Sequence, residues 1–280
     1  MADIEFLKGW IGRQERAADH AAPPPLAGLA ALLDHAEPPW RAGEAPPLSH
    51  WLYFLPRARQ SEIDIDGHPK RGGFLPPVDL PRRMFAGARF AFHAPIMIDA
   101  AMARVSTIAD VAEKIGASGR MVFVTVRHEV FADGVPALTE EQDIVYRAAA
   151  KPDAAPVVAT PDARAPDAVR TIRPDPVLLF RYSALTFNGH RIHYDRDYAR
   201  DVEGYPGLVV HGPLIATLLM DHFLRAHPGA AVTHFSFRAR RPLFDTAPFD
   251  LCLKKKSGGA ELWARDAAGA AAMTAEVDAA

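Results

Sequence analysis

The pattern of apolar and polar positions repeats once along the chain. Residues 88–148 and 232–279 each contain an alternating strand that reaches a proline, then a second strand, a glycine-containing turn and two more strands. Alternation with a period of two residues is typical of strands with one buried face. The shared order of events therefore predicts a duplicated antiparallel sheet unit.

Each half also has a candidate helix ahead of its strands. Residues 23–35 begin with prolines and place leucines at helical spacing, and residues 212–225 carry apolar residues around most of the helix circumference. A helix that is apolar on nearly all sides is expected to be buried. These elements together predict an α+β double hot-dog fold, in which two antiparallel sheets are each wrapped around a buried helix.

A segment rich in proline, alanine and aspartate separates the two halves. Residues 149–176 show neither helical nor strand periodicity, which is typical of a linker. The predicted organisation is an N-terminal hot-dog over 1–148, a linker over 149–176 and a C-terminal hot-dog over 177–280.

Composition narrows the class of function. The 280 residues are 49% hydrophobic and 24% charged, with a formal net charge of -2 and no long single-sign run. Neither a nucleic-acid nor a membrane partner is therefore indicated. The single cysteine, Cys252, lies in an alternating apolar run and is expected to be buried and structural. One cysteine and an amino terminus without signal-peptide features favour a cytoplasmic protein.

A cluster of polar residues follows a β-like run over 178–187. Asn188, His190, Arg191 and His193 lie in a segment without strand or helix pattern, and Asp195 is suited to cap a short helix that ends at Gly204. The four residues are therefore expected on a loop between a strand and a short helix. Loops of this kind present side chains to ligands.

The second polar feature is the sequence HGP at 211–213, where the buried helix is expected to begin. The first N–H groups of a helix lack internal acceptors and carry the positive end of its dipole. Gly212 allows a ligand to approach these groups closely, and Pro213 suits the first turn. This arrangement is that of an oxyanion hole.

The two features together, YSALTFNGHRIHYD and YPGLVVHGPL, resemble the MaoC-like branch of hot-dog proteins, which includes (R)-specific enoyl-CoA hydratases and dehydratases. The resemblance implies a catalytic carboxylate and a histidine five positions apart, which correspond to Asn188 and His193. It also implies that Gly212 donates its N–H to a thioester carbonyl. His190, Arg191 and His211 would contact the substrate.

Asn188 departs from this pattern because an amide cannot accept a proton at neutral pH. Either His193 is the sole acid–base group and Asn188 only holds the water, or His190 or Asp195 supplies the second function. An imidazole titrates near neutral pH, which favours His193.

Residues 50–87 resemble the matching segment of bacterial mesaconyl-C4-CoA hydratases of the itaconate pathway. That segment places Lys70 and Arg71 on a loop rich in glycine and proline, and Arg82 and Arg83 in a turn. Such cations suit the phosphates of coenzyme A or a substrate carboxylate.

The expected activity is the reversible hydration of an α,β-unsaturated acyl-CoA, from mesaconyl-C4-CoA to citramalyl-CoA. The first half would form the acyl tunnel, which leaves one active site per chain. No metal and no cofactor are expected, since coenzyme A is part of the substrate. Two alternatives stay open: a broader 3-hydroxyacyl-thioester dehydratase acting on CoA or carrier-protein substrates, and a non-catalytic thioester-binding subunit. A double hot-dog already contains the pairing that single hot-dogs reach by dimerising, so the sequence leaves open whether the chain forms a homodimer.

Overall fold

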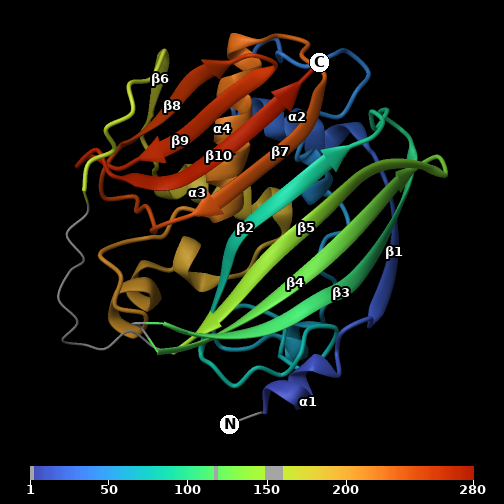
Figure 1. Ribbon diagram of the computed structural model, residues 1–280, viewed down its shortest axis with the longest axis vertical. Helices are drawn as coiled ribbons and strands as arrows, with labels where there is room; N and C mark the ends of the chain where they lie inside the picture. The colour runs from blue at the N-terminus through green and yellow to red at the C-terminus, as the bar shows by residue number, and fades with distance from the viewer. Residues whose placement is uncertain (1–2, 117–118, 149–159) are drawn as a thin grey trace.

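A single antiparallel sheet runs through both halves of the computed structural model, which describes all residues except 1–2, 117–118 and 149–159 (Figure 1). The elements of the first half are α1 (Ile4–Lys8), β1 (Gln14–His20), α2 (Pro23–Leu32), η1 (Ser49–Leu52), η2 (Gln60–Glu62), β2 (Arg82–Phe92), β3 (Ala101–Gly116), β4 (Gly119–Ala132) and β5 (Val135–Arg147). Those of the second half are β6 (Ala168–Ile172), α3 (Pro176–Thr186), η3 (Arg191–His193), η4 (Tyr198–Val202), α4 (Gly212–Ala226), β7 (Val232–Ala239), β8 (Phe249–Lys256), β9 (Gly259–Arg265) and β10 (Ala271–Ala279).

The strand order is symmetric about the centre of the sheet. It runs β1-β3-β4-β5-β2-β7-β10-β9-β8-β6, so each strand of the first half has a counterpart at the mirrored position in the second. This order confirms the duplicated unit. The two sheets that we expected are joined edge to edge, because β2 and β7 pair with each other. Gly87 permits the junction, since a Cβ there would lie 2.5 Å from the carbonyl oxygen of Phe237.

The helix α4 is buried as predicted, and in Figure 1 it lies behind the strands of the second half. Every residue from Leu214 to Leu224 is buried, and the helix contacts β8, β9 and β10. Asp221 is the charged exception within this stretch. Its carboxylate is 2.5 Å from His35 Nε2, 2.7 Å from Arg170 and 2.9 Å from Arg225. These partners compensate a buried charge that would otherwise destabilise the fold.

The first half differs from our expectation at its helix. In the element order α2 corresponds to α3, and α2 packs against α3 and η1. Between α2 and β2 the described residues form only the short turns η1 and η2, so this half has no counterpart of α4. The segment 48–54 takes part in the core instead, with Leu52, Tyr53 and Phe54 buried. The leucines at helical spacing predicted the helix correctly. They could not predict that it packs against α3 and η1.

A cavity of about 170 Å³ lies beside this segment. Its lining includes Tyr53, Glu140 and, from the end of α3, Thr186. Glu140 is buried and accepts hydrogen bonds from His50 Nε2 at 2.9 Å and Trp51 Nε1 at 3.0 Å. The bond to Glu140 holds the His50 ring in the core of the first half.

The run 178–187, which we predicted as a strand, is the helix α3. Asp175 caps it by accepting a hydrogen bond from the N–H of Leu178 at 2.8 Å, and Pro176 is its first residue. Leu179, Tyr182 and Ser183 are buried, a spacing of three and four that belongs to one helical face. A short apolar run fits both periods, and here the N-terminal cap and proline determine the helix.

The structure describes part of the predicted linker. Residues 149–159 lie outside the described residues, and 168–172 form the edge strand β6 paired with β8. Cys252 is buried on β8, as expected, and burial raises the pKa of its thiol to about 11. Within the described part of the chain, no helix is long and apolar enough to span a membrane.

Candidate active site

The N-terminus of α4 presents an unused hydrogen-bond donor. Gly212 is the first residue of α4, His211 caps the helix and Pro213 follows. The N–H of Gly212 has no acceptor among the described residues. A Cβ at this position would meet only the carbonyl oxygen of Phe85, 4.0 Å away. The donor therefore lies at the positive end of a buried helix, on a residue with open space at its Cβ position.

His193 lies next to this helix end with one ring nitrogen held and the other free. The residue is buried, with 7% of its surface exposed. Its Nδ1–H donates to the carbonyl oxygen of Val209 at 2.7 Å. This bond assigns the proton to Nδ1 and leaves Nε2 as an acceptor. Nε2 has no hydrogen-bond partner among the described residues, and it is not fully buried, so it keeps some contact with solvent. His193 can therefore accept a proton from a bound molecule.

His211 packs face to face on His193. The two ring centroids are 3.6 Å apart with an interplanar angle of 19°, and His211 Nε2 lies 2.8 Å from Ser183 Oγ. His211 Nδ1 is buried and has no partner in the described part of the chain. Burial, followed by the neighbouring histidines, holds the pKa of His211 well below its usual value. His211 is thus a neutral ring that orients His193.

Asn188 uses its side chain within its own loop. Its side-chain Oδ1 accepts the backbone N–H of His190 at 3.0 Å. Its backbone N–H donates to Ser183 O at 2.8 Å. The preceding residue, Phe187, ends α3 with a left-handed conformation at φ 47°. Asn188 therefore shapes the turn that leads into the site, which is a role that an amide fulfils well.

A loop from the first half lies against this turn. The N–H of Arg191 donates to Asp66 O at 2.9 Å, and Arg191 Nη1 donates to Ile65 O at 3.2 Å. The approach depends on two glycines, because a Cβ on Gly67 would lie 1.8 Å from the carbonyl oxygen of Gly189. Gly67 also has a φ of +90°, which other residues rarely adopt. The two halves of the chain thus build one site.

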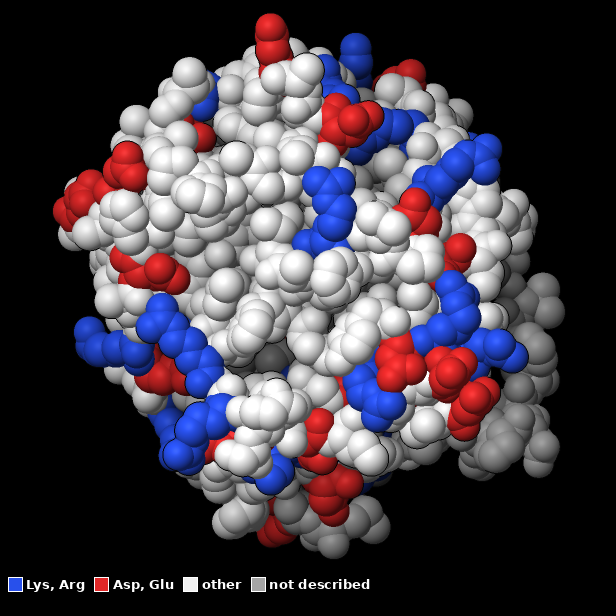
Figure 2. Space-filling model, turned by 180° about the vertical axis from the view of Figure 1, so that it is seen from behind, with Lys and Arg blue, Asp and Glu red and all other residues white. Residues whose placement is uncertain are grey.

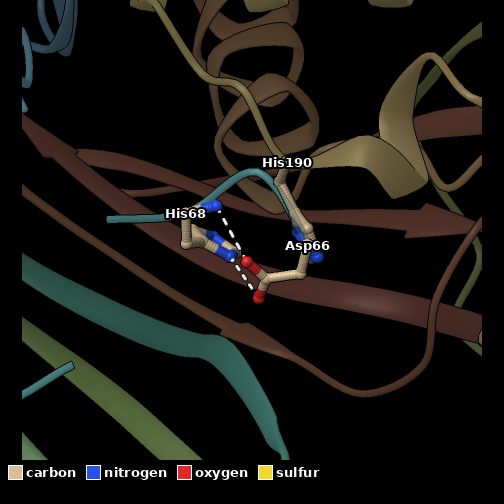
Figure 3. Close-up of side chains that lie close together, drawn as sticks. All are labelled: Asp66, His68 and His190. Atoms are coloured by element: carbon tan, nitrogen blue, oxygen red, sulfur yellow. Dashed lines mark hydrogen bonds and ion pairs between the residues drawn. The ribbon is translucent and has the colours of Figure 1, made fainter. Parts of the chain in front are cut away.

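This loop brings Asp66 and His68 to His190, as Figure 3 shows. Asp66 accepts the N–H of His68 at 2.8 Å and its ring Nδ1–H at 3.0 Å. The rings of His68 and His190 are 4.1 Å apart, and those of His190 and His193 are 5.4 Å apart. His68, His190, His193 and His211 therefore form a continuous histidine row, with one carboxylate at its end. Atoms of Asp66, His68 and His190 within 4.8 Å of one another would suit a metal ion, but Asp66 and His68 already bond to each other.

Burial keeps the histidine row uncharged. It lowers the pKa of His193 to about 4, against the opposing bond to Val209, and together with the adjacent histidines it lowers that of His190 to about 2. Burial lowers the pKa of His68 as well, although its bond to Asp66 opposes this shift. Burial alone would raise the pKa of Asp66, but the hydrogen bonds from His68 outweigh it and the net shift is downward. At neutral pH the row is neutral and Asp66 is its anion.

Three of the four basic residues that we predicted to bind the substrate already bond to other groups of the protein. Lys70 Nζ donates to a backbone carbonyl at 2.9 Å, and Arg71 donates to three carbonyls of the segment 78–81. Arg82 binds Glu203 through a backbone bond of 2.9 Å and an ion pair of 3.8 Å. These contacts indicate roles in holding the loops together.

Arg83 differs from these three. It is half-buried and forms no ion pair with any described residue. It contacts Tyr146, and its charge lowers the pKa of both His68 and His190. Arg83 is therefore a cation whose charge acts on the histidine row without an ion pair of its own among the described residues. Figure 2 shows the face of the molecule that is hidden in Figure 1. Basic side chains on it mostly lie beside acidic ones, so the surface charge of this face does not indicate one phosphate site.

Comparison with known proteins identifies the family. The family model of hydroxyacyl-thioester dehydratase type 2 matches residues 48–245, which include the loop of Asp66, the histidine row and Gly212. This chain belongs to the hydroxyacyl-thioester dehydratase type 2 family. The expected class of enzyme, a hydratase or dehydratase, is thereby confirmed.

Similar proteins support both the family and the fold of this dehydratase-family chain. It is 50% identical to the mesaconyl-C(4)-CoA hydratase of Chloroflexus aurantiacus over 282 residues, covering 99% of each chain. A MaoC-like dehydratase structure from Phytophthora capsici matches with a TM-score of 0.73 at 12% identity, covering 100% of this chain and 98% of that one. A Mycobacterium tuberculosis protein described as a double hotdog fold matches with a TM-score of 0.57 at 12% identity, covering 96% of each chain. The double hot-dog prediction is confirmed.

The sequence singled out one group of the residues that lie together in this candidate site and did not single out the other. His190, His193, His211 and Gly212 come together as the shared motif suggested. Arg191 and Asp195 instead bind each other at 2.7 Å, and Asp195 also accepts the N–H of Tyr198, the first residue of η4, at 3.0 Å. Sequence reasoning missed Asp66 and His68. The only signal was an acid two residues before a histidine in DGHPK, which is too common to single out.

Proposed function

We propose that this chain hydrates mesaconyl-C4-CoA to citramalyl-CoA. The observation that carries the proposal is the 50% identity, over 99% of both chains, to a protein that bears the name of this activity. The residues around His193 and Gly212 supply the two requirements of such a hydration. One is a proton acceptor for water, and the other is a donor for the thioester oxygen.

In the proposed reaction the N–H of Gly212 binds the thioester carbonyl oxygen. As the water oxygen bonds to the β-carbon, one water O–H bond breaks and Nε2 of His193 takes the proton. The π electrons of the double bond move toward the thioester, where the helix end stabilises the enolate. A proton then adds to the α-carbon, so that water is added in full and the site regains its starting protonation. These steps use protons and amide dipoles alone, so added metals or cofactors should not raise the rate.

Arg83 fits the substrate's second carboxylate. In a mesaconyl-C4 thioester the β-carbon bears a methyl group and this carboxylate, so the matching cation must lie beside the point where water adds. The charge of Arg83 acts on His68 and His190, and Tyr146 is its neutral partner. By contrast, Lys70, Arg71 and Arg82 bond to backbone carbonyls or to Glu203. A bidentate pair with Arg83 would orient the β-carbon toward His193.

The broader alternative is a dehydratase for 3-hydroxyacyl thioesters without a second carboxylate. The family description favours it, whereas a cation that forms no ion pair with any described residue, Arg83, favours the dicarboxylic substrate. The experiment is an assay of the purified protein with mesaconyl-C4-CoA and with crotonyl-CoA, which follows the loss of enoyl-thioester absorbance. We expect kcat/KM to be at least about tenfold higher for mesaconyl-C4-CoA, since a charge-assisted hydrogen bond contributes about 1.5–3 kcal/mol. Preference for crotonyl-CoA would support the alternative, and binding of both without turnover would indicate a non-catalytic subunit.

A further inference from the structure

The proposed site has a proton acceptor in His193, and no carboxylate of the described residues hydrogen-bonds to its ring. The side chain of Asn188 is engaged by the N–H of His190, and Asp195 is engaged by Arg191. When His193 takes a proton from water, a positive charge forms on a buried ring whose partners are a backbone carbonyl and a neutral histidine. The site therefore needs a nearby group that compensates this charge.

Asp66 and His68 have the geometry of such a group. Nδ1 of His68 donates to one carboxylate oxygen of Asp66 at 3.0 Å, and its backbone N–H donates to the other at 2.8 Å. A carboxylate on Nδ1 fixes the tautomer, leaves Nε2 free to exchange protons and stabilises the imidazolium form. Within the histidine row, His68 is the member that hydrogen-bonds to a carboxylate. A proton on the row is therefore best accommodated at His68.

His190 bridges the distance between this pair and His193. Its ring lies 4.1 Å from that of His68 and 5.4 Å from that of His193. Both His68 and His190 are only half-buried, so a bound substrate or water can reach them. The charged groups that face this part of the row are Asp66, which favours protonation, and Arg83 and Arg71, which oppose it. A substrate carboxylate on Arg83 would offset that opposition.

We propose that Asp66 and His68 are the second acid–base pair of the site and exchange a proton with His193 through His190. This inference rests on the proposed hydration. His193 takes the water proton as the bond from oxygen to the β-carbon forms, and the proton passes through His190 to Nε2 of His68. It returns along the same row when the enolate is protonated at the α-carbon. One proton leaves water and one reaches carbon, so the pair ends each turnover as it began.

The pair gives the first half a part in the chemistry, beyond the tunnel that the sequence suggested. Its loop is docked by the backbone contact between Gly67 and Gly189 and by Arg191. The carboxylate absent from position 188 is thus supplied from the other half of the chain.

The test uses the full chain with Asp66→Asn and His68→Gln. Asparagine keeps an acceptor for the His68 ring but removes the charge. We expect each variant to lower kcat about 100-fold, within the range for general acid–base groups, with KM changed less than threefold and a larger solvent deuterium isotope effect on kcat. The control is Asp64→Asn in the same loop. The Asp64 side chain is exposed and, among the described residues, bonds only to the N–H of Ile65. This variant should behave as the unmodified protein.

A second measurement needs no substrate. Histidine ring NMR across pH should show that the pKa of His68 falls by about one unit or more in Asp66→Asn, because an adjacent opposite charge typically shifts a pKa by 1–3 units. An unchanged His68 titration, or kcat within threefold of the unmodified protein in Asp66→Asn, would overturn the inference. Loss of activity with a chelator and its return with zinc would also overturn it, because the three residues would then be metal ligands. If the unmodified chain turns over no enoyl thioester, the proposed function fails. The NMR titration still tests whether Asp66 raises the pKa of His68.

Discussion

Substitution of Gly212 by alanine separates catalysis from stability in this chain. The added methyl group would lie in open space, since the nearest atom is the carbonyl oxygen of Phe85 at 4.0 Å. Gly212 is not in the left-handed region, so alanine adopts its backbone conformation without strain. The fold should tolerate the change, whereas a carbonyl oxygen that must approach the Gly212 N–H would meet the methyl group.

We expect the substitution to raise the stability of the fold and to lower the rate of catalysis. Alanine at a compatible glycine position stabilises a protein by about 0.4–1 kcal/mol, chiefly because the unfolded chain loses freedom. For a chain of this size that corresponds to a rise in Tm of about 1–4 °C. Alanine keeps the backbone N–H, but its methyl group holds the carbonyl oxygen away from it. An oxyanion donor that is lost in full costs about 2.7–4 kcal/mol in the transition state, so kcat should fall by up to about 10²–10³-fold.

The assay pairs thermal unfolding with the enoyl-thioester absorbance assay. Gly73→Ala is the matched control, because Gly73 lies on an exposed loop where a Cβ would also meet nothing within 4 Å. Both variants should retain or gain stability, and only Gly212→Ala should lose activity. Unchanged kcat in Gly212→Ala would refute the assignment of the helix N-terminus as the oxyanion site.

Three further predictions concern the histidines and Arg83. His193→Gln should lower kcat by about 10²–10⁴-fold while calorimetry still detects binding of the CoA ester; retained turnover would remove His193 from its role. Because buried His193 has a pKa of about 4 against about 6.5 in the unfolded chain, the unfolded chain binds more protons between these values. The free energy of unfolding should therefore fall as pH drops from about 6.5 to 4, and a Tm that stays flat over this range would contradict the buried neutral row. Arg83→Gln should raise KM for mesaconyl-C4-CoA about 10–100-fold, from the loss of about 1.5–3 kcal/mol, and leave KM for crotonyl-CoA within threefold; equal effects on both substrates would argue against a carboxylate contact.

The accuracy of the sequence predictions follows the length of the pattern behind them. The helix at 212–226 is correct because its apolar positions extend over four turns, and the duplicated strands are correct because the alternation recurs in both halves. The run 178–187 is too short to distinguish the two periods, so α3 was predicted as a strand. Its cap, Asp175, and Pro176 are the local signals that would have corrected the prediction.

By itself, then, the sequence determined the repeated hot-dog units, the buried helix with Gly212 at its start, and the loop that carries His190 and His193. These depend on neighbours within a few turns, whose side-chain periodicity is written along the chain. Only the tertiary structure decided that the two sheets join at β2 and β7, that the first half has no counterpart of α4, and that Asp66 and His68 lie against His190. These features depend on residues far apart in sequence. The loop of Asp66 and His68 reaches His190 because the backbones of Gly67 and Gly189 approach where no side chain would fit.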